Sequence, residues 1–138
     1  MKWIYDDGGR SKYYKGHTAD CVCRAIAIGT GMDYKEVYDL INTYSKKEES
    51  DSSARTGVAS DITYQILTDL GWTWEPTMYF GQGCKTHLRE DELPKNKTII
   101  ARLSKHLTCI VDSIIHDTYD PSRDGKRCVY GYFIKEAV

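Results

Sequence analysis

The sequence predicts an α+β fold, in which N-terminal helices pack on a C-terminal antiparallel sheet. Apolar residues recur at helical spacing between residues 21 and 70. Short apolar runs bounded by turn residues follow between residues 98 and 134. Neither an internal repeat nor a clear linker interrupts this order, so we expect a single domain over residues 1–138.

The first predicted helix begins at Cys21. Thr18 and Asp20 directly precede it, and both residue types favour the N-cap position of a helix. Gly29 and Gly31 are suited to end it, because glycine readily adopts the left-handed backbone that closes many helices. Cys21 is therefore expected in the first turn.

Two further helices are predicted, separated by a polar loop over residues 46–57. One follows an aspartate cap at Asp33, and the other follows Ser60 and ends near Gly71. The remaining segments predict a short strand near Trp3, strands over residues 72–75, 98–103, 107–111, 114–119 and 129–134, and a short helical piece over residues 87–93.

Composition and charge exclude several classes of protein. The formal net charge is -1, which makes nucleic-acid binding unlikely as a function. The chain has neither a signal peptide at its start nor an apolar run of the roughly 18 residues that a membrane helix needs. We therefore expect a cytoplasmic protein with no membrane partner. In that reducing compartment, the five cysteines are expected to be free, catalytic or metal-bound rather than bridged.

Cys21 has the placement of a nucleophile. A helix N-terminus stabilises a thiolate, which is the reactive form of cysteine. The backbone N–H groups of the first turn have no partner within the helix, so the N–H of Cys21 can bind a developing oxyanion. By contrast, Cys23, Cys109 and Cys128 are expected to be small core residues.

His106 is the best candidate for the base, because it stands at the start of a predicted strand after a polar turn. If Asp112 and Ser113 form a two-residue hairpin loop, Asp117 becomes the diagonal neighbour of His106 on the same face. A three-residue loop would instead place Asp120 opposite His106, since a slip of one residue exchanges the two faces. We favour Asp117 as the group that orients the imidazole.

Two segments carry a resemblance to a known family: Asp20-Cys21-Val22-Cys23-Arg24-Ala25-Ile26-Ala27 and His106-Leu107-Thr108-Cys109-Ile110-Val111-Asp112. They resemble small phage and bacterial proteins with a papain-like cysteine peptidase fold, which are distantly similar to double-glycine leader peptidases. The resemblance extends over most of the chain. It implies that Cys21 is the nucleophile, His106 the base and Asp117 the orienting residue.

The chain departs from the papain-like pattern at the oxyanion hole. These enzymes usually carry a glutamine several residues before the cysteine, and no glutamine precedes Cys21. Thr18, His17 or Asp20 could stand in its place, although a carboxylate would repel an oxyanion unless it faces away. Arg55 and Thr56, at the end of the polar loop, are further candidates for shaping the cleft.

Three functions are consistent with the sequence. The first is a thiol-dependent hydrolase or acyltransferase that acts on a peptide, isopeptide or amide bond of a peptide or protein substrate, including a host protein if the chain is phage-encoded. It would need no cofactor and no metal. The second is a catalytically silent papain-like protein that captures a host factor or a small molecule. The third is a zinc-stabilised module, for which His17, Cys21 and Cys23, or Cys84 and His87, are the candidate ligands.

Overall fold

The computed structural model describes residues 1–135, and their order of helices and strands follows the predicted order closely. The elements are β1 (Lys2–Tyr5), the 3-10 turn η1 (Arg10–Lys12), α1 (Cys21–Thr30), α2 (Tyr34–Lys47), α3 (Ser60–Asp69), β2 (Thr73–Pro76), the 3-10 turn η2 (Glu90–Glu92), β3 (Thr98–Leu103), β4 (His106–Val111), β5 (Ile114–Asp117) and β6 (Gly131–Ile134). The α+β class is thus confirmed.

The sheet has the strand order β1-β5-β4-β3-β6-β2, and it is mixed rather than antiparallel. All neighbouring pairs are antiparallel except β1 and β5, which run parallel. The expectation of an antiparallel sheet is therefore wrong at this edge. The reason is topological: β1 and β5 are separated by more than a hundred residues, and no local turn fixes their relative direction.

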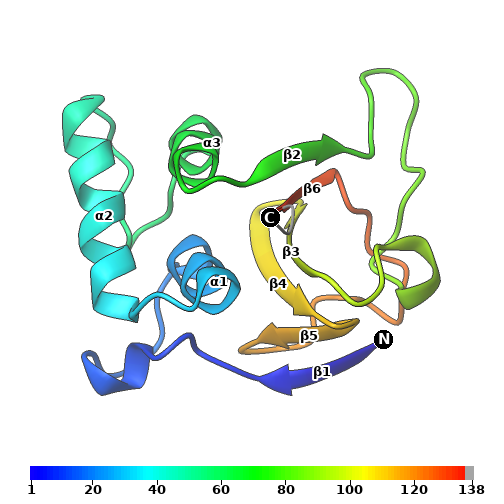
Figure 1. Ribbon diagram of the computed structural model, residues 1–138, viewed down its shortest axis with the longest axis horizontal. Coiled ribbons are helices and arrows are strands. Elements are labelled where there is room, and N and C mark those ends of the chain that lie inside the picture. The colour runs from blue at the N-terminus through cyan, green and yellow to red at the C-terminus, as the bar shows by residue number, and fades with distance from the viewer. Residues whose placement is uncertain (136–138) are drawn as a thin grey trace.

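Helices cover one face of the sheet, with α1 lying between α2 and the strands (Figure 1). Alternate residues of β3 and β4, namely Ile100, Leu107 and Cys109, join the core that α1 and the other helices form. Gly29 allows α1 to approach closely, because a Cβ at this position would lie only 2.9 Å from the Ile100 Cδ1 atom.

Loops rather than helices cover the opposite face. Leu88 and Leu93 come from the segment between β2 and β3, and Val129 comes from the segment before β6. They pack on the other set of alternating strand residues, which includes Ile99 and Ile110. The sheet is therefore the middle layer between two small cores.

The hairpin between β4 and β5 has the predicted two-residue turn. Val111 pairs with Ile114, and Asp112 and Ser113 both have positive φ angles, of 49° and 66°. Such a pair is typical of the turn that matches the natural twist of a hairpin. This register places Asp117 opposite Thr108, and therefore on the same face as His106.

One expectation about the cysteines is wrong. Cys84 and Cys128 form a disulfide, with their Cα atoms 5.9 Å apart. The bridge joins the segment after β2 to the segment before β6, where His87 and Cys128 also form an isolated β-bridge. The sequence could not predict this pairing because it depends on the long-range arrangement of two loops. Cys23 and Cys109 are free and fully buried, as predicted, whereas Cys128, also expected in the core, is half-buried and bridged.

Within residues 1–135, none of the helices has the length and apolar character that crossing a membrane would require.

Candidate active site

Cys21 is the first residue of α1, as the sequence predicted. Its side chain is half-buried and lines the same hollow as the His106 ring, which comes from the start of β4. The first hydrogen bond of the helix runs from the Arg24 N–H to the Asp20 carbonyl oxygen. The N–H of Cys21 lies before it, among the first-turn donors that have no helical acceptor.

Asp117 orients His106. Its Oδ2 atom lies 2.7 Å from the His106 Nε2 atom, and the same oxygen accepts a hydrogen bond of 2.7 Å from the Thr108 hydroxyl. The Asp117 Oδ1 atom accepts a hydrogen bond from the Thr118 N–H. Because Nε2 is bound to the carboxylate, Nδ1 is the ring nitrogen that remains for the thiol of Cys21.

The pKa values of Cys21, His106 and Asp117 depend on one another. Burial opposes ionisation of Cys21, but the hydrogen bond with His106 and its positive charge lower the pKa of the thiol below its ordinary value. Burial also opposes a charged imidazole, yet hydrogen bonds with Asp117 and Cys21 raise the pKa of His106. Burial opposes ionisation of Asp117 too, but its hydrogen bond with His106 keeps the pKa of its carboxyl low. All three shifts run in the direction of a thiolate–imidazolium pair beside a carboxylate.

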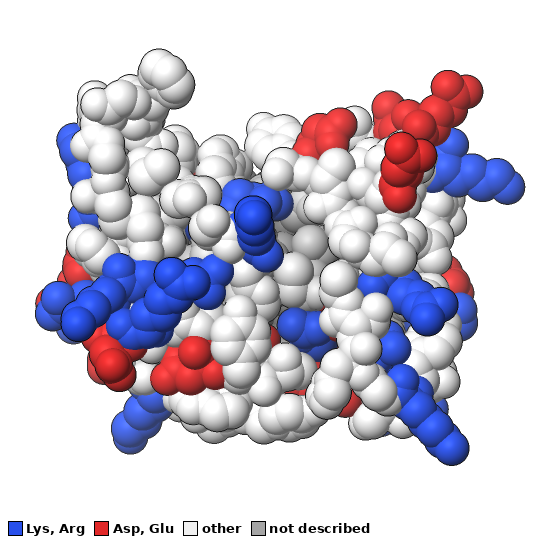
Figure 2. All heavy atoms as spheres, turned by 180° about the vertical axis from the view of Figure 1, so that it is seen from behind, with Lys and Arg blue, Asp and Glu red and all other residues white. Residues whose placement is uncertain are grey.

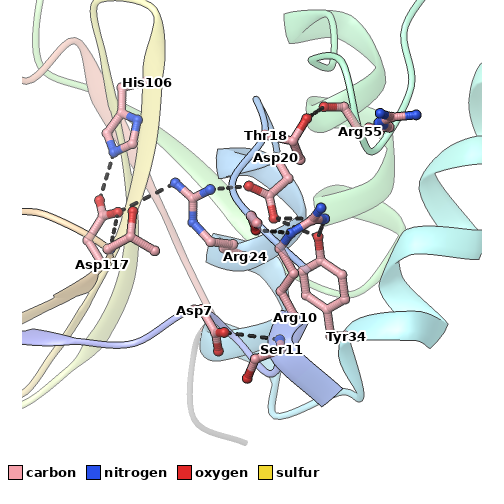
Figure 3. A network of polar contacts seen from close by, with 12 residues as sticks. Asp7, Arg10, Ser11, Thr18, Asp20, Arg24, Tyr34, Arg55, His106 and Asp117 are labelled. Carbon is pink, nitrogen blue, oxygen red and sulfur yellow. Dashed lines mark hydrogen bonds and ion pairs between the residues drawn. The ribbon is translucent and has the colours of Figure 1, made fainter. Parts of the chain in front are cut away.

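Arg24 connects this site to a buried polar network (Figure 3). Its guanidinium lies between two carboxylates: it forms a short ion pair with Asp20 and lies 3.6 Å from the Asp117 Oδ1 atom. Asp20 also accepts a hydrogen bond of 2.6 Å from the Tyr34 hydroxyl, which in turn accepts one from Arg10. The network holds the start of α1 against α2 and against the end of β5.

Asp20 is therefore not positioned to stabilise an oxyanion. It occupies the N-cap position of α1, but its side chain makes no capping hydrogen bond and is almost completely buried beneath the two arginines. Its carboxylate does not line the hollow that contains Cys21 and His106, which removes the electrostatic objection to an aspartate directly before Cys21. The N–H of Cys21 remains the donor that can be named for an oxyanion.

A hollow of about 330 Å³ opens over Cys21 and His106. Thr18, Ala19 and Tyr119 belong to its lining. The Thr18 hydroxyl donates a hydrogen bond of 2.8 Å to the Arg55 carbonyl oxygen, so the loop before α3 is fastened to the rim of the cleft. The candidates Thr18 and Arg55 thus shape the cleft and do not take part in proton transfer. Thr56 instead bonds within its own loop, to Ser53.

The structure brings the predicted Cys21, His106 and Asp117 together, whereas Asp120 lies elsewhere. The Asp120 carboxylate accepts a hydrogen bond from the Ser122 N–H in the loop that follows β5. The strand ends at Asp117, so no ladder continues far enough to bring Asp120 opposite His106. The two-residue turn at Asp112 and Ser113 sets the register that places Asp117, rather than Asp120, next to His106.

Sequence reasoning missed Thr108 and Arg24. Thr108 interrupts an otherwise apolar strand, and Arg24 lies within the apolar first helix at a spacing of four from Asp20. Polar residues inside apolar segments need buried partners, and this was the available signal. Its meaning depended on the position of Asp117, which only the folded sheet defines.

The proposed zinc ligands do not form a metal site, although the Cys84 Sγ atom lies 3.7 Å from the His87 Nε2 atom. Among residues 1–135 no group of three or more histidine, cysteine, aspartate or glutamate side chains could hold a metal ion. Cys84 is bound to Cys128, and Cys23 faces α2, where its thiol contacts the Tyr34 carbonyl oxygen.

Comparisons of the chain with protein-family models, with curated proteins and with solved structures found no match.

Proposed function

We propose that this protein is a thiol-dependent hydrolase or acyltransferase of papain-like fold, which cleaves a peptide, isopeptide or amide bond through an acyl-enzyme on Cys21. The observation that carries the proposal is that Cys21 and His106 line the same open hollow, with His106 held 2.7 Å from the Asp117 carboxylate. A nucleophile, a base and an orienting group in contact are the minimum that acyl transfer to a thiol requires.

The geometry supports the following sequence of steps. The Cys21 thiolate attacks the substrate carbonyl carbon, and the new oxyanion lies near the N–H of Cys21. The imidazolium of His106 gives its proton to the leaving amine as the carbon–nitrogen bond breaks. His106 then removes a proton from water, which attacks the thioester and releases the acid and the thiol. An amine in place of water gives acyl transfer instead.

The proposal is tested with p-nitrophenyl acetate, a small activated ester. We expect a burst of p-nitrophenolate, steady turnover, and an acetyl group on Cys21 detected by mass spectrometry of peptides. Cys21→Ala should abolish both phases, and His106→Ala should slow both. Cys23→Ala, a matched removal of the neighbouring thiol, should leave them unchanged. Acetylation spread over several residues, or a rate unaffected by Cys21→Ala, would refute the proposal.

One observation favours a second candidate, a catalytically silent papain-like protein that binds a host factor or a small molecule. Only one backbone donor for an oxyanion can be named, and the glutamine expected in papain-like enzymes has no counterpart before Cys21. The two functions differ in their response to Cys21→Ser. The variant should lose turnover if the protein is an enzyme, and it should retain its biological effect if the protein only binds.

A further inference from the structure

A second hollow, of about 470 Å³, lies outside the triad and is lined in part by Arg102. Arg102 is the penultimate residue of β3 and pairs with Leu107 of β4. Because directly paired residues share a face, its side chain lies on the helix side of the sheet, as Leu107 does. This is the side from which α1 presents Cys21.

Apolar and aromatic groups form most of the wall of this hollow. Trp74 of β2 and Phe133 of β6 lie in contact, with ring centroids 4.8 Å apart. Tyr64 of α3 closes the wall, with its ring centroid 6.3 Å from that of Phe133. Ser60, the first residue of α3, and Arg102 complete the hollow.

The guanidinium of Arg102 is short of partners. Within residues 1–135, its Nη2 atom is buried and has no hydrogen-bond partner, and no carboxylate lies within ion-pair distance of the side chain. A guanidinium nitrogen that is buried without a partner loses its hydration and gains no hydrogen bond in return. Burial accordingly lowers the pKa of Arg102, and the nearby negative charge of Cys21 opposes that shift. A cationic side chain without a carboxylate partner, in the wall of an aromatic hollow, is suited to a ligand that supplies the anion.

We propose that Arg102 binds a carboxylate of the substrate while Trp74, Phe133 and Tyr64 contact an apolar group next to it. This inference rests on the proposed function in so far as the ligand is a substrate, and it names the class: acyl compounds or peptides that carry a carboxylate next to an apolar group. One guanidinium matches the planar oxygens and the single charge of a carboxylate. A dianionic phosphate would need further cations, and the exposed Asp61 at the rim disfavours a second negative charge.

The charge that this hollow offers to an anion is local. Figure 2 shows lysine and arginine side chains on the same face as aspartate and glutamate side chains, and the net charge of the chain is close to zero. Among the described residues that line the hollow, Arg102 is the cation.

Direct binding tests this proposal without relying on catalysis. In a Cys21→Ser background, calorimetry is used to compare hydrocinnamate with its neutral amide. We expect the carboxylate to bind about tenfold more tightly, in keeping with one charge-assisted contact. Arg102→Met should remove this preference while leaving the binding of the amide nearly unchanged, and Arg102→Lys should retain part of it. Lys105→Met removes a cation that lines the hollow over Cys21 and serves as the matched control, for which the preference should persist.

Two peptide ligands distinguish the source of the carboxylate. N-acetylphenylalanine offers a free terminal carboxylate, whereas N-acetyl-glutamyl-phenylalaninamide offers only a side-chain carboxylate. Whichever binds in a manner that depends on Arg102 defines the substrate class. Equal binding of acid and amide, or a preference that survives Arg102→Met in protein shown to be folded by circular dichroism, would overturn the assignment. If Cys21 proves unreactive while the Arg102-dependent preference stands, the proposed catalysis fails and the binding site remains.

Discussion

Cys21 and Cys23 lie two residues apart on the first turn of α1, yet their environments give them opposite chemical character. Hydrogen bonding with His106 lowers the pKa of Cys21 despite its burial, whereas burial raises the pKa of Cys23 to about 12. Both thiols experience the same helix N-terminus. The difference lies in what each faces: Cys21 faces the His106 ring, and Cys23 faces the Tyr34 carbonyl oxygen at a distance of 3.7 Å. The partner, more than the helix dipole, distinguishes a reactive thiol from an inert one.

The largest expected effect on turnover comes from replacing one of these two cysteines, Cys21, by alanine, with Cys23→Ala as the comparison. Cys21→Ala should remove essentially all turnover, because the other free thiols of residues 1–135, Cys23 and Cys109, are fully buried, and burial raises the pKa of each. Cys23→Ala should leave turnover within about twofold and affect mainly stability, by roughly 1 kcal/mol, through loss of buried volume. Turnover of p-nitrophenyl acetate and chemical denaturation measure the two quantities. A large loss of turnover in the folded Cys23→Ala variant would contradict the comparison.

His106→Ala should make Cys21 resemble Cys23. Removing the ring removes the hydrogen bond and the positive charge that lower the pKa of the thiol, while the burial that raises it remains. We expect alkylation of Cys21 near neutral pH to slow roughly a hundredfold or more. His116→Ala is the control, because that ring pairs with Asp6 and lies outside the triad. Unchanged labelling of Cys21 in the folded His106→Ala variant would argue against a functional pair.

Asp117→Asn should have a smaller effect in the same direction. Loss of the carboxylate lowers the pKa of His106, which weakens the imidazolium and in turn raises the pKa of Cys21. We expect the rate of alkylation at neutral pH to fall roughly tenfold, with the rising limb of its pH profile moved to higher pH. Asp120→Asn removes a carboxylate of the following loop and should change neither quantity. If the two variants behave alike, Asp117 does not orient His106.

Arg24→Lys should have the smallest effect on rate and a clear effect on stability. Lysine keeps the positive charge between Asp20 and Asp117 but cannot present two donors at once. We expect a loss of about 1–3 kcal/mol in the free energy of unfolding, from buried acceptors left unpaired. Arg24→Met, which leaves both carboxylates without the cation, should cost about 3–5 kcal/mol. Lys35→Met removes an exposed ion pair with Asp39 and should be nearly neutral.

The local features of this molecule could be predicted from the sequence. The start of α1 at Cys21, the residues of β3 and the turn at Asp112 and Ser113 follow from spacing and turn chemistry. That turn also identified Asp117, because a hairpin register propagates from its loop. Each of these features depends on residues that are close together in the chain.

The features that could not be predicted depend on contacts between distant segments. The parallel pairing of β1 with β5, the disulfide between Cys84 and Cys128 and the buried position of Asp20 all arise from packing. Arg102 is the clearest case. As a sequence residue it is one arginine in an apolar strand, and its significance comes from a hollow built by α3, β2 and β6.

The central claim is that Cys21 exists as a thiolate paired with the imidazolium of His106. It is tested most directly by measuring iodoacetamide alkylation of each free cysteine as a function of pH, with peptides resolved by mass spectrometry. The account predicts that Cys21 is labelled first, with a rate that rises below the pH range of an ordinary thiol, while the buried Cys23 and Cys109 stay protected until the protein unfolds. Labelling of all three at similar slow rates, or a Cys21 profile that follows an ordinary thiol, would contradict it.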